Sequence, residues 1–137
     1  MIDIESAIFS RIAKEFDKKF AGGSRYNEPN PTPAKFPCLQ AYRSDRSWSG
    51  YTGLDAENIV FDVDAYSNLA SGGKQQCKDM LEVAEDALLS FGAWELVFVD
   101  TVPNIDNRIY RMKARYRAVA VQESDEDSEY FVRIYRR

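Results

Sequence analysis

The sequence predicts an α+β fold in which two helices pack on one face of a four- to five-stranded, mainly antiparallel sheet. Segments Asn58–Ser67 and Arg108–Val121 alternate apolar and polar residues, which is typical of a strand with one buried face. Segments Asp3–Phe20 and Gly73–Phe91 instead repeat apolar residues at helical spacing, along one stripe each. Because a helix with one apolar stripe must bury it, we expect both helices to cover the sheet.

One domain is expected over residues 1–137, with residues 122–137 as a C-terminal arm or an extra edge strand. A chain of 137 residues is long enough to bury an independent core. Its hydrophobic content of 45% and charged content of 29% are ordinary for a soluble globular domain. Its net charge of -4 argues against generic binding to nucleic-acid backbones, which requires an excess of basic residues.

The first helix is expected over Asp3–Phe20, with acids in its first turn and lysines in its last turn, as the helix dipole favours. Gly22 and Gly23 follow it and are expected to end it. The next segment, Ser24–Pro37, holds four prolines and is predicted to be a loop, because proline removes backbone donors.

The second helix is expected from about Gly72 or Gly73 to Phe91, with Ser71 as its N-cap. Its start, Ser71–Lys74, resembles a phosphate-binding loop only superficially. That loop requires a glycine five positions before its Gly-Lys pair and a serine or threonine after it. Asn68 and Gln75 stand at those positions, so we expect no nucleotide site here.

Four strands are expected, at Cys38–Tyr42, Asn58–Ser67, Trp94–Val102 and Arg108–Val121. The crossover through the second helix makes the second and third strands run in the same direction. The turn at Pro103–Asn107 makes the fourth strand antiparallel to the third. The fourth strand therefore fits between them, which gives the spatial order 1-2-4-3 and leaves the second face of the sheet in solvent. Tyr130–Tyr135 is either a fifth strand or an arm that adds to a neighbour.

The predicted sheet order brings acidic and basic residues together on the solvent face. The residues of this charged face are Asp62, Asp64, Arg111, Lys113, Arg115 and Arg117. One interpretation is a site for phosphate or an acidic partner. The interpretation we favour is cross-strand pairing, because the chain is acidic overall and opposite charges on neighbouring strands attract. A sheet that reads nucleic acid also needs stacking aromatic rings on that face, and Tyr110 and Tyr116 alternate to the other one.

The composition argues against an enzyme. The chain has no histidine, so the commonest general base and metal ligand is missing. Its two cysteines, Cys38 and Cys77, are far apart, and we interpret them as buried free thiols. Asp62 and Asp64 lie downstream of other acids, but no glycine-shaped loop gathers them around a cation. We therefore expect no catalytic residues, no metal and no cofactor.

Two segments are the expected sites of contact with other proteins. The long connection Ser44–Glu57 holds Arg46, Trp48 and Tyr51, and it is predicted equally to be a contact loop or to fold back onto the core. The last segment contributes Tyr130, Phe131 and Tyr135. A membrane is not an expected partner, because no apolar run approaches the roughly 18 residues of a spanning helix. The acidic start of the chain is unlike a signal peptide, so a reducing cytoplasm is expected.

Three short segments resemble a known family. They are Asp64–Asn68, Ser71–Lys74 at the start of the second helix, and Val102–Arg111. The whole stretch from Ile59 to Val119 is similar to small tail-assembly proteins of siphophages and prophages. These are the tail terminator and tail-completion proteins, also termed minor capsid or head-tail joining proteins.

The resemblance implies a structural virion protein rather than an enzyme. Proteins of this kind form a hexameric ring that caps the tail tube, ends its polymerisation and joins it to the head. The implied partners are further copies of the chain, the tail tube protein and the head-tail connector proteins. DNA would pass through the lumen without specific binding, and assembly would occur in the cytoplasm of the bacterial host, ending in the tail or neck of the virion. The alternatives are a head-completion or neck connector adaptor, and a nucleic-acid-binding α/β module.

Overall fold

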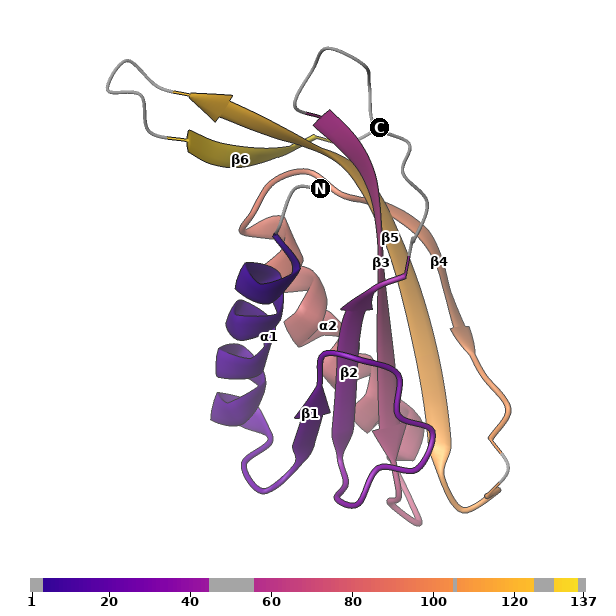
Figure 1. Ribbon diagram of the computed structural model, residues 1–137. Coiled ribbons are helices and arrows are strands. Elements are labelled where there is room, and N and C mark those ends of the chain that lie inside the picture. Colours follow the sequence, from indigo (N-terminus) through magenta and orange to yellow (C-terminus); the bar gives the residue numbers. More distant parts are fainter. Residues whose placement is uncertain (1–3, 45–55, 105, 125–129, 136–137) are drawn as a thin grey trace.

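The structure is a computed structural model that describes residues 4–44, 56–104, 106–124 and 130–135. Two helices and six strands are arranged with both helices on one face of a single sheet (Figure 1). In chain order they are α1 (Glu5–Lys19), β1 (Ser24–Tyr26), β2 (Cys38–Arg43), β3 (Ala56–Ser67), α2 (Gly73–Leu89), β4 (Glu95–Thr101), β5 (Tyr110–Ser124) and β6 (Tyr130–Tyr135).

The sheet is mixed, with strand order β1-β2-β3-β5-β4 and β6 paired to β5. The predicted α+β class is confirmed, and the strand count and order differ from the prediction in detail. The prediction of a loop over Ser24–Pro37 is wrong in part, since Ser24–Tyr26 pairs in parallel with the start of β2. A strand of three residues is too short to show an alternating pattern.

The register of β3 against β5 places the alternating apolar residues of both strands on the helix-covered face. Ile59 lies opposite Ala118, and Phe61 lies opposite Tyr116. The pairs Val63–Ala114 and Ala65–Met112 continue the row. All eight of these residues are buried, so the inward face predicted from alternation is present.

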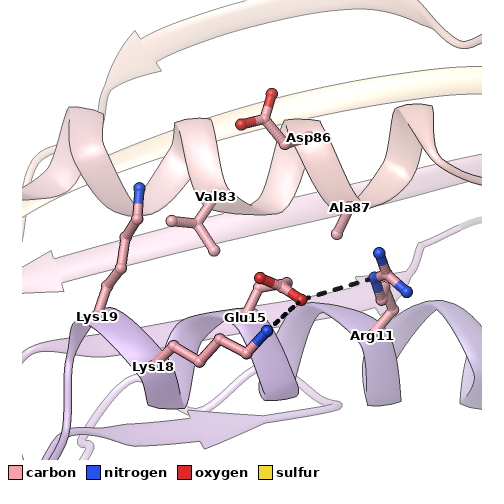
Figure 2. Close-up of a pocket in the computed structure, with 7 residues that line it drawn as sticks. All are labelled: Arg11, Glu15, Lys18, Lys19, Val83, Asp86 and Ala87. Atoms are coloured by element: carbon pink, nitrogen blue, oxygen red, sulfur yellow. Dashed lines mark hydrogen bonds and ion pairs between the residues drawn. The ribbon is translucent and has the colours of Figure 1, made fainter.

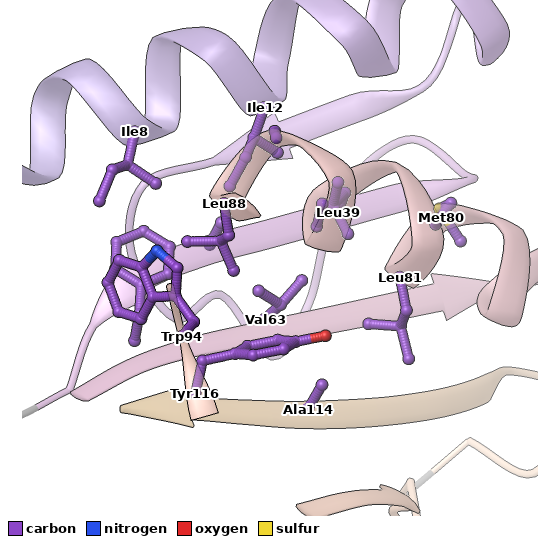
Figure 3. Packing of buried hydrophobic residues seen from close by; sticks show 14 of the residues in the cluster. Ile8, Ile12, Leu39, Val63, Met80, Leu81, Leu88, Trp94, Ala114 and Tyr116 are labelled. Atoms are coloured by element: carbon purple, nitrogen blue, oxygen red, sulfur yellow. The ribbon is translucent and has the colours of Figure 1, made fainter. Parts of the chain in front are cut away.

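Both helices insert one apolar stripe into this face (Figure 3). Ile8, Ile12 and Phe16 of α1 are at most 2% exposed. The stripe of α2 includes Met80 and Leu88, which are both fully buried. The core therefore consists of side chains from two helices packed over the central strands, as the helical spacing predicts.

The start of α2 differs from the prediction. The N-cap is Gly72 in a left-handed conformation (φ 83°), and no side chain caps the helix, so the assignment of Ser71 as N-cap is wrong. Ser67 supplies a tether instead, because its hydroxyl donates a hydrogen bond to the Gln76 side chain at 2.5 Å. A Cβ on Gly73 would lie 3.4 Å from Ser67, so the helix starts in close contact with the end of β3.

Cys38 and Cys77 are buried free thiols, as predicted. Burial raises the pKa of the Cys77 thiol to about 12, partly offset by a hydrogen bond from the Met112 backbone. Both cysteines therefore serve as small core side chains. Neither described helix is long and apolar enough to cross a membrane.

The end of β5 and β6 form a hairpin that turns away from the rest of the sheet (Figure 1). β5 continues past the last residue that pairs with β3, Val121, and its final residues pair with β6 alone. The base of the hairpin is held by Ile134, which is 5% exposed. The Ala93 N–H donates a 3.2 Å hydrogen bond to the Ile134 carbonyl, which ties the hairpin to the α2–β4 connection.

Leu88→Ala is expected to lower the free energy of unfolding by about 2–5 kcal/mol, because it leaves a cavity between α2 and the sheet. The neighbouring Leu89 is 51% exposed, so Leu89→Ala is a matched control that should change stability by about 0.5 kcal/mol or less. Urea unfolding followed by far-ultraviolet circular dichroism measures both. Equal effects of the two substitutions would contradict the packing described for α2.

Candidate functional site

Two carboxylates are fully buried on the face of the sheet that no helix covers. Asp62 is 1% exposed and Asp64 is 0% exposed, although both side chains project away from the helices. They alternate along β3 with the core residues Phe61, Val63 and Ala65. A buried carboxylate is costly unless charged and hydrogen-bonding partners surround it.

Asp64 receives hydrogen bonds from two neighbouring strands. The Tyr42 hydroxyl on β2 donates to it at 2.8 Å. Arg111 on β5 donates from Nε at 3.1 Å and from Nη2 at 2.8 Å. The carboxylate is therefore held between the strands on either side of its own.

Asp62 makes a two-pronged ion pair with Arg115, whose Nε and Nη2 atoms donate at 2.7 and 2.9 Å. The Lys113 ammonium lies 3.3 Å from Asp62 and 3.9 Å from Asp64, so it bridges the two carboxylates. The cross-strand pairing expected from the sequence is therefore present for three of the four predicted cations. Arg117 differs, because it pairs with Glu95 on β4 at 2.7 Å.

Asp62, Asp64, Arg111, Lys113 and Arg115 together form a charge layer on this face of the sheet. Aromatic rings pack against its cations. Arg111 lies over Tyr66 at 5.1 Å, Lys113 over Tyr42 at 5.9 Å and Arg115 over Phe98 at 5.3 Å, measured to the ring centroids. Cations placed over ring faces in this way are attracted by the ring quadrupole. The rings and the alkyl stems of the cations together exclude water from the carboxylates.

The positions of the three rings beside the charge layer were not predicted from the sequence. Alternation along β2 and β3 could have placed Tyr42 and Tyr66 on the same face as Asp64. Phe98 could not be placed, because a register irregularity between Leu96 and Phe98 shifts the second half of β4. Tyr66 is 2% exposed and Tyr42 is 8% exposed, so these rings are not available to stack on bases.

The electrostatics of the layer favour its charged form. Burial alone would raise the pKa of Asp62, but the Arg115 hydrogen bond and the charges of Lys113 and Arg115 outweigh it, so the pKa is lowered. Burial likewise raises the pKa of Tyr66 to about 12, against the opposing charge of Arg111. Neither group titrates near neutral pH, so neither is suited to general acid–base chemistry there.

A second buried ion pair joins Arg43 at the end of β2 to Glu57 near the start of β3, with side chains 9% and 8% exposed. The Arg43 backbone N–H also donates to the Glu5 carboxylate at 2.6 Å, which ties the first turn of α1 to the sheet. Glu57 falls in the segment predicted to be a connection, so this pair was not predicted.

Two hollows of the described part of the chain lie beside paired charges, and neither of these two gathers reactive groups. One of about 490 Å³ lies beside the charge layer and is lined by residues that include Tyr42, Arg43 and Lys113. The other, of about 220 Å³, lies between α1 and α2, where Glu15 pairs with Arg11 and Lys18 (Figure 2). Within residues 4–44, 56–104, 106–124 and 130–135, no three side chains are placed to hold a metal ion.

The contact residues expected from the sequence are placed only in part. Arg46, Trp48 and Tyr51 lie outside the described residues. Tyr130 and Phe131 lie in β6, and Tyr135 at its end is 43% exposed. β4 also carries three exposed apolar side chains that were not predicted, those of Leu96, Val97 and Val99, which are 45%, 43% and 49% exposed.

Comparison with known proteins shows the fold and no more. No protein-family model matches the chain, and no curated protein matches it in sequence. Solved structures that resemble this chain include 31 chains, and one of them carries a name that states no function. It is 17% identical, with a TM-score of 0.55 over 90% of this chain and 96% of the other. At that identity the likeness supports a shared fold and carries no function.

Asp64→Asn is expected to lower the free energy of unfolding by about 3–5 kcal/mol, because it leaves Arg111 and Lys113 over a buried neutral group. Glu15→Gln is the control, since it removes the exposed pairs with Arg11 and Lys18, and exposed pairs contribute about 0–1 kcal/mol. Chemical denaturation measures both variants. Equal stability of Asp64→Asn and wild type would contradict a structural role for the layer.

The charge layer also predicts loss of stability in acid. The pKa of Asp62 is lower in the folded protein than its ordinary value of 3.8, so the unfolded chain binds more protons in acid. The stability that Asp62 contributes is present above that value and is lost as the pH falls through the folded pKa. As the pH falls below about 4, wild type should therefore lose more unfolding free energy than Asp62→Asn. Unfolding free energies that fall equally with pH in wild type and in Asp62→Asn would contradict this prediction.

Proposed function

We propose that this chain is a structural assembly protein of a phage tail, a tail terminator whose subunits form a ring that caps the tail tube, ends its polymerisation and joins it to the head. The observation that carries the proposal is the exposed apolar edge of β4 beside a projecting β5–β6 hairpin. Exposed apolar strand edges are unusual on proteins that act as monomers, because they pair with other chains. Such an edge can supply a contact between the subunits of a closed assembly.

The positions of the family-like segments support the same proposal. Asp64–Asn68 spans the end of β3, and Ser71–Lys74 leads into the first residues of α2. The described residues of Val102–Arg111 lie between the end of β4 and the start of β5. Ser67 lies opposite Tyr110 in the sheet register, and Gly73 packs between them. Three segments that are separate in sequence therefore form one end of the molecule (Figure 1).

The charge layer supports a lumen that does not grip DNA. Arg111, Lys113 and Arg115 are engaged by buried carboxylates, so they are not available as a row of phosphate contacts. Binding to a nucleic-acid backbone depends on releasing counterions from many phosphates, and paired cations on an acidic chain contribute little to it. This disfavours the nucleic-acid-binding alternative.

Light scattering coupled to size-exclusion chromatography tests the proposed function. We expect a hexamer, or a monomer that becomes hexameric on tail tubes. Added to polymerising tail tube protein, the chain should arrest growth, which electron microscopy measures as a shortened tube-length distribution.

Other outcomes identify the alternatives. A dodecamer that leaves tube length unchanged would favour a neck connector adaptor. A monomer that binds DNA with a steep salt dependence would favour a nucleic-acid-binding module and contradict the proposed function.

A further inference from the structure

The last strand of the chain lies in a seat that other segments form. β6 pairs antiparallel with residues 119–124 of β5. Gly92, in the connection from α2 to β4, forms a parallel bridge with Ile134 of β6, and the Ala93 N–H donates a hydrogen bond to the Ile134 carbonyl at 3.2 Å. We use the term β6 seat for residues 119–124 of β5 together with Gly92 and Ala93.

A buried side chain anchors β6 in this seat. The structure describes two β6 side chains, and of these Ile134 is 5% exposed and belongs to the hydrophobic core, whereas Tyr135 is 43% exposed. A Cβ on Gly92 would touch the Ile134 carbonyl oxygen and would lie 2.7 Å from the Ile134 Cβ, too close for two carbon atoms that are not bonded. Because Gly92 has no side chain, it forms a notch into which Ile134 fits closely.

The anchor lies at the end of β6 that is farther from the β5–β6 connection. β6 begins at Tyr130, and Ile134 is the fifth of its six residues. At the connection end, the residues of β5 after Val121 pair with β6 and no longer with β3, and the hairpin turns away from the rest of the sheet (Figure 1). Two strands without further support are marginally stable at best in water. The contacts that hold β6 are therefore concentrated around Ile134.

The connection itself is strongly acidic. It consists of residues 125–129, and four of these five residues are aspartate or glutamate. Because β5 and β6 are antiparallel, a connection within one subunit reverses the direction of the chain over these residues. Such a reversal keeps like charges close, and their repulsion falls as the distance between them grows. A connection that continues to a second subunit separates the charges.

We infer that β6 of one subunit fills the β6 seat of a second copy of the chain. The occupant follows from the structure, since β6 is the strand whose register and anchor fit this seat. An exchanged strand keeps every contact between β6 and the seat, and exchange of an identical element between copies is a low-cost route to an oligomer. Each subunit then donates one strand and accepts one.

The acidic connection favours head-to-tail exchange over a reciprocal dimer. Two subunits that exchange strands with each other bring their two connections side by side, which gathers the acids of both in one place. Exchange with the next copy keeps the connections apart, and repeated contacts of this kind close into a ring or extend into a filament. The inference rests on the proposed function for its role, and it identifies the contact between the subunits of the ring.

A double-cysteine variant distinguishes exchange from a closed hairpin. Val119 and Tyr135 lie directly opposite each other in the β5–β6 register, so Val119→Cys/Tyr135→Cys places a thiol on the seat and another on the strand. The native Cys38 and Cys77 are both 0% exposed. The variant is oxidised free in solution and on tail tubes, and denaturing electrophoresis without reductant separates the products. We expect a ladder of covalent multimers. A covalent monomer as the main product in both states would overturn the inference.

The single variants control for accidental disulfides. Val119→Cys and Tyr135→Cys can each form a covalent dimer at most. When the two are given different tags and mixed, exchange predicts that the mixed dimer exceeds the dimers of either variant with itself several-fold. Equal amounts of the three dimers would count against exchange.

A variant of the notch gives an independent readout. Gly92→Ala places a Cβ against Ile134, so at equal protein concentration it should reduce the oligomer several-fold. Gly22→Ala is the matched control, because Gly22 also has a positive φ, of 89°, but no atom lies within 4 Å of the position of its Cβ. Circular dichroism shows whether both variants remain folded, and light scattering measures the oligomer. An oligomer that survives Gly92→Ala unchanged would contradict seating at the notch.

The tail-tube assay separates the two proposals. Arrest of tube growth by a double-cysteine variant that gives only covalent monomers would overturn the inference and leave the proposed function standing. Exchanged, cross-linked oligomers that do not arrest tube growth would support the inference and overturn the function.

Discussion

The pairing of β3 with β5 fixes both the apolar core and the charged face of the sheet. Twelve residue pairs join these central strands. On one face their register aligns Phe61 with Tyr116 in the core, and on the other it aligns Asp62 with Arg115. A slip of one residue would turn Asp62 and Asp64 into the apolar core, because side chains alternate along a strand. Apolar burial and ion pairing therefore specify the same register.

The charge layer buries side chains on the face of the sheet that neither helix covers. Sheets with one open face usually present ordinary polar side chains there. Here the carboxylates are covered by cations, and the cations lie over Tyr42, Tyr66 and Phe98. This arrangement satisfies the open face internally. Among the described residues, the surfaces that this leaves for other molecules include the edges of the sheet at β4 and at the β5–β6 hairpin, and the proposed assembly role rests on these edges.

Prediction from sequence succeeded where one local pattern determines the outcome and failed where several segments act together. Alternation identified the inward row of Ile59, Phe61, Val63 and Ala65 and the opposite position of Asp62 and Asp64. It did not identify β1, because three residues show no period. It assigned the N-cap of α2 to Ser71, whereas Gly72 occupies that position in a left-handed conformation, which glycine adopts without steric cost.

The α+β class, the two amphipathic helices and the two faces of the central strands are readable from the sequence, since each follows from a periodicity within one segment. The pairing of Arg117 with Glu95, the pairing of Arg43 with Glu57, and the packing of the aromatic rings over the charge layer are visible in the folded chain alone. The folded chain also places β6 and β4 end to end along one side of β5. These features depend on register and on the order of strands, which are properties of several distant segments together and are set by the packing that joins them.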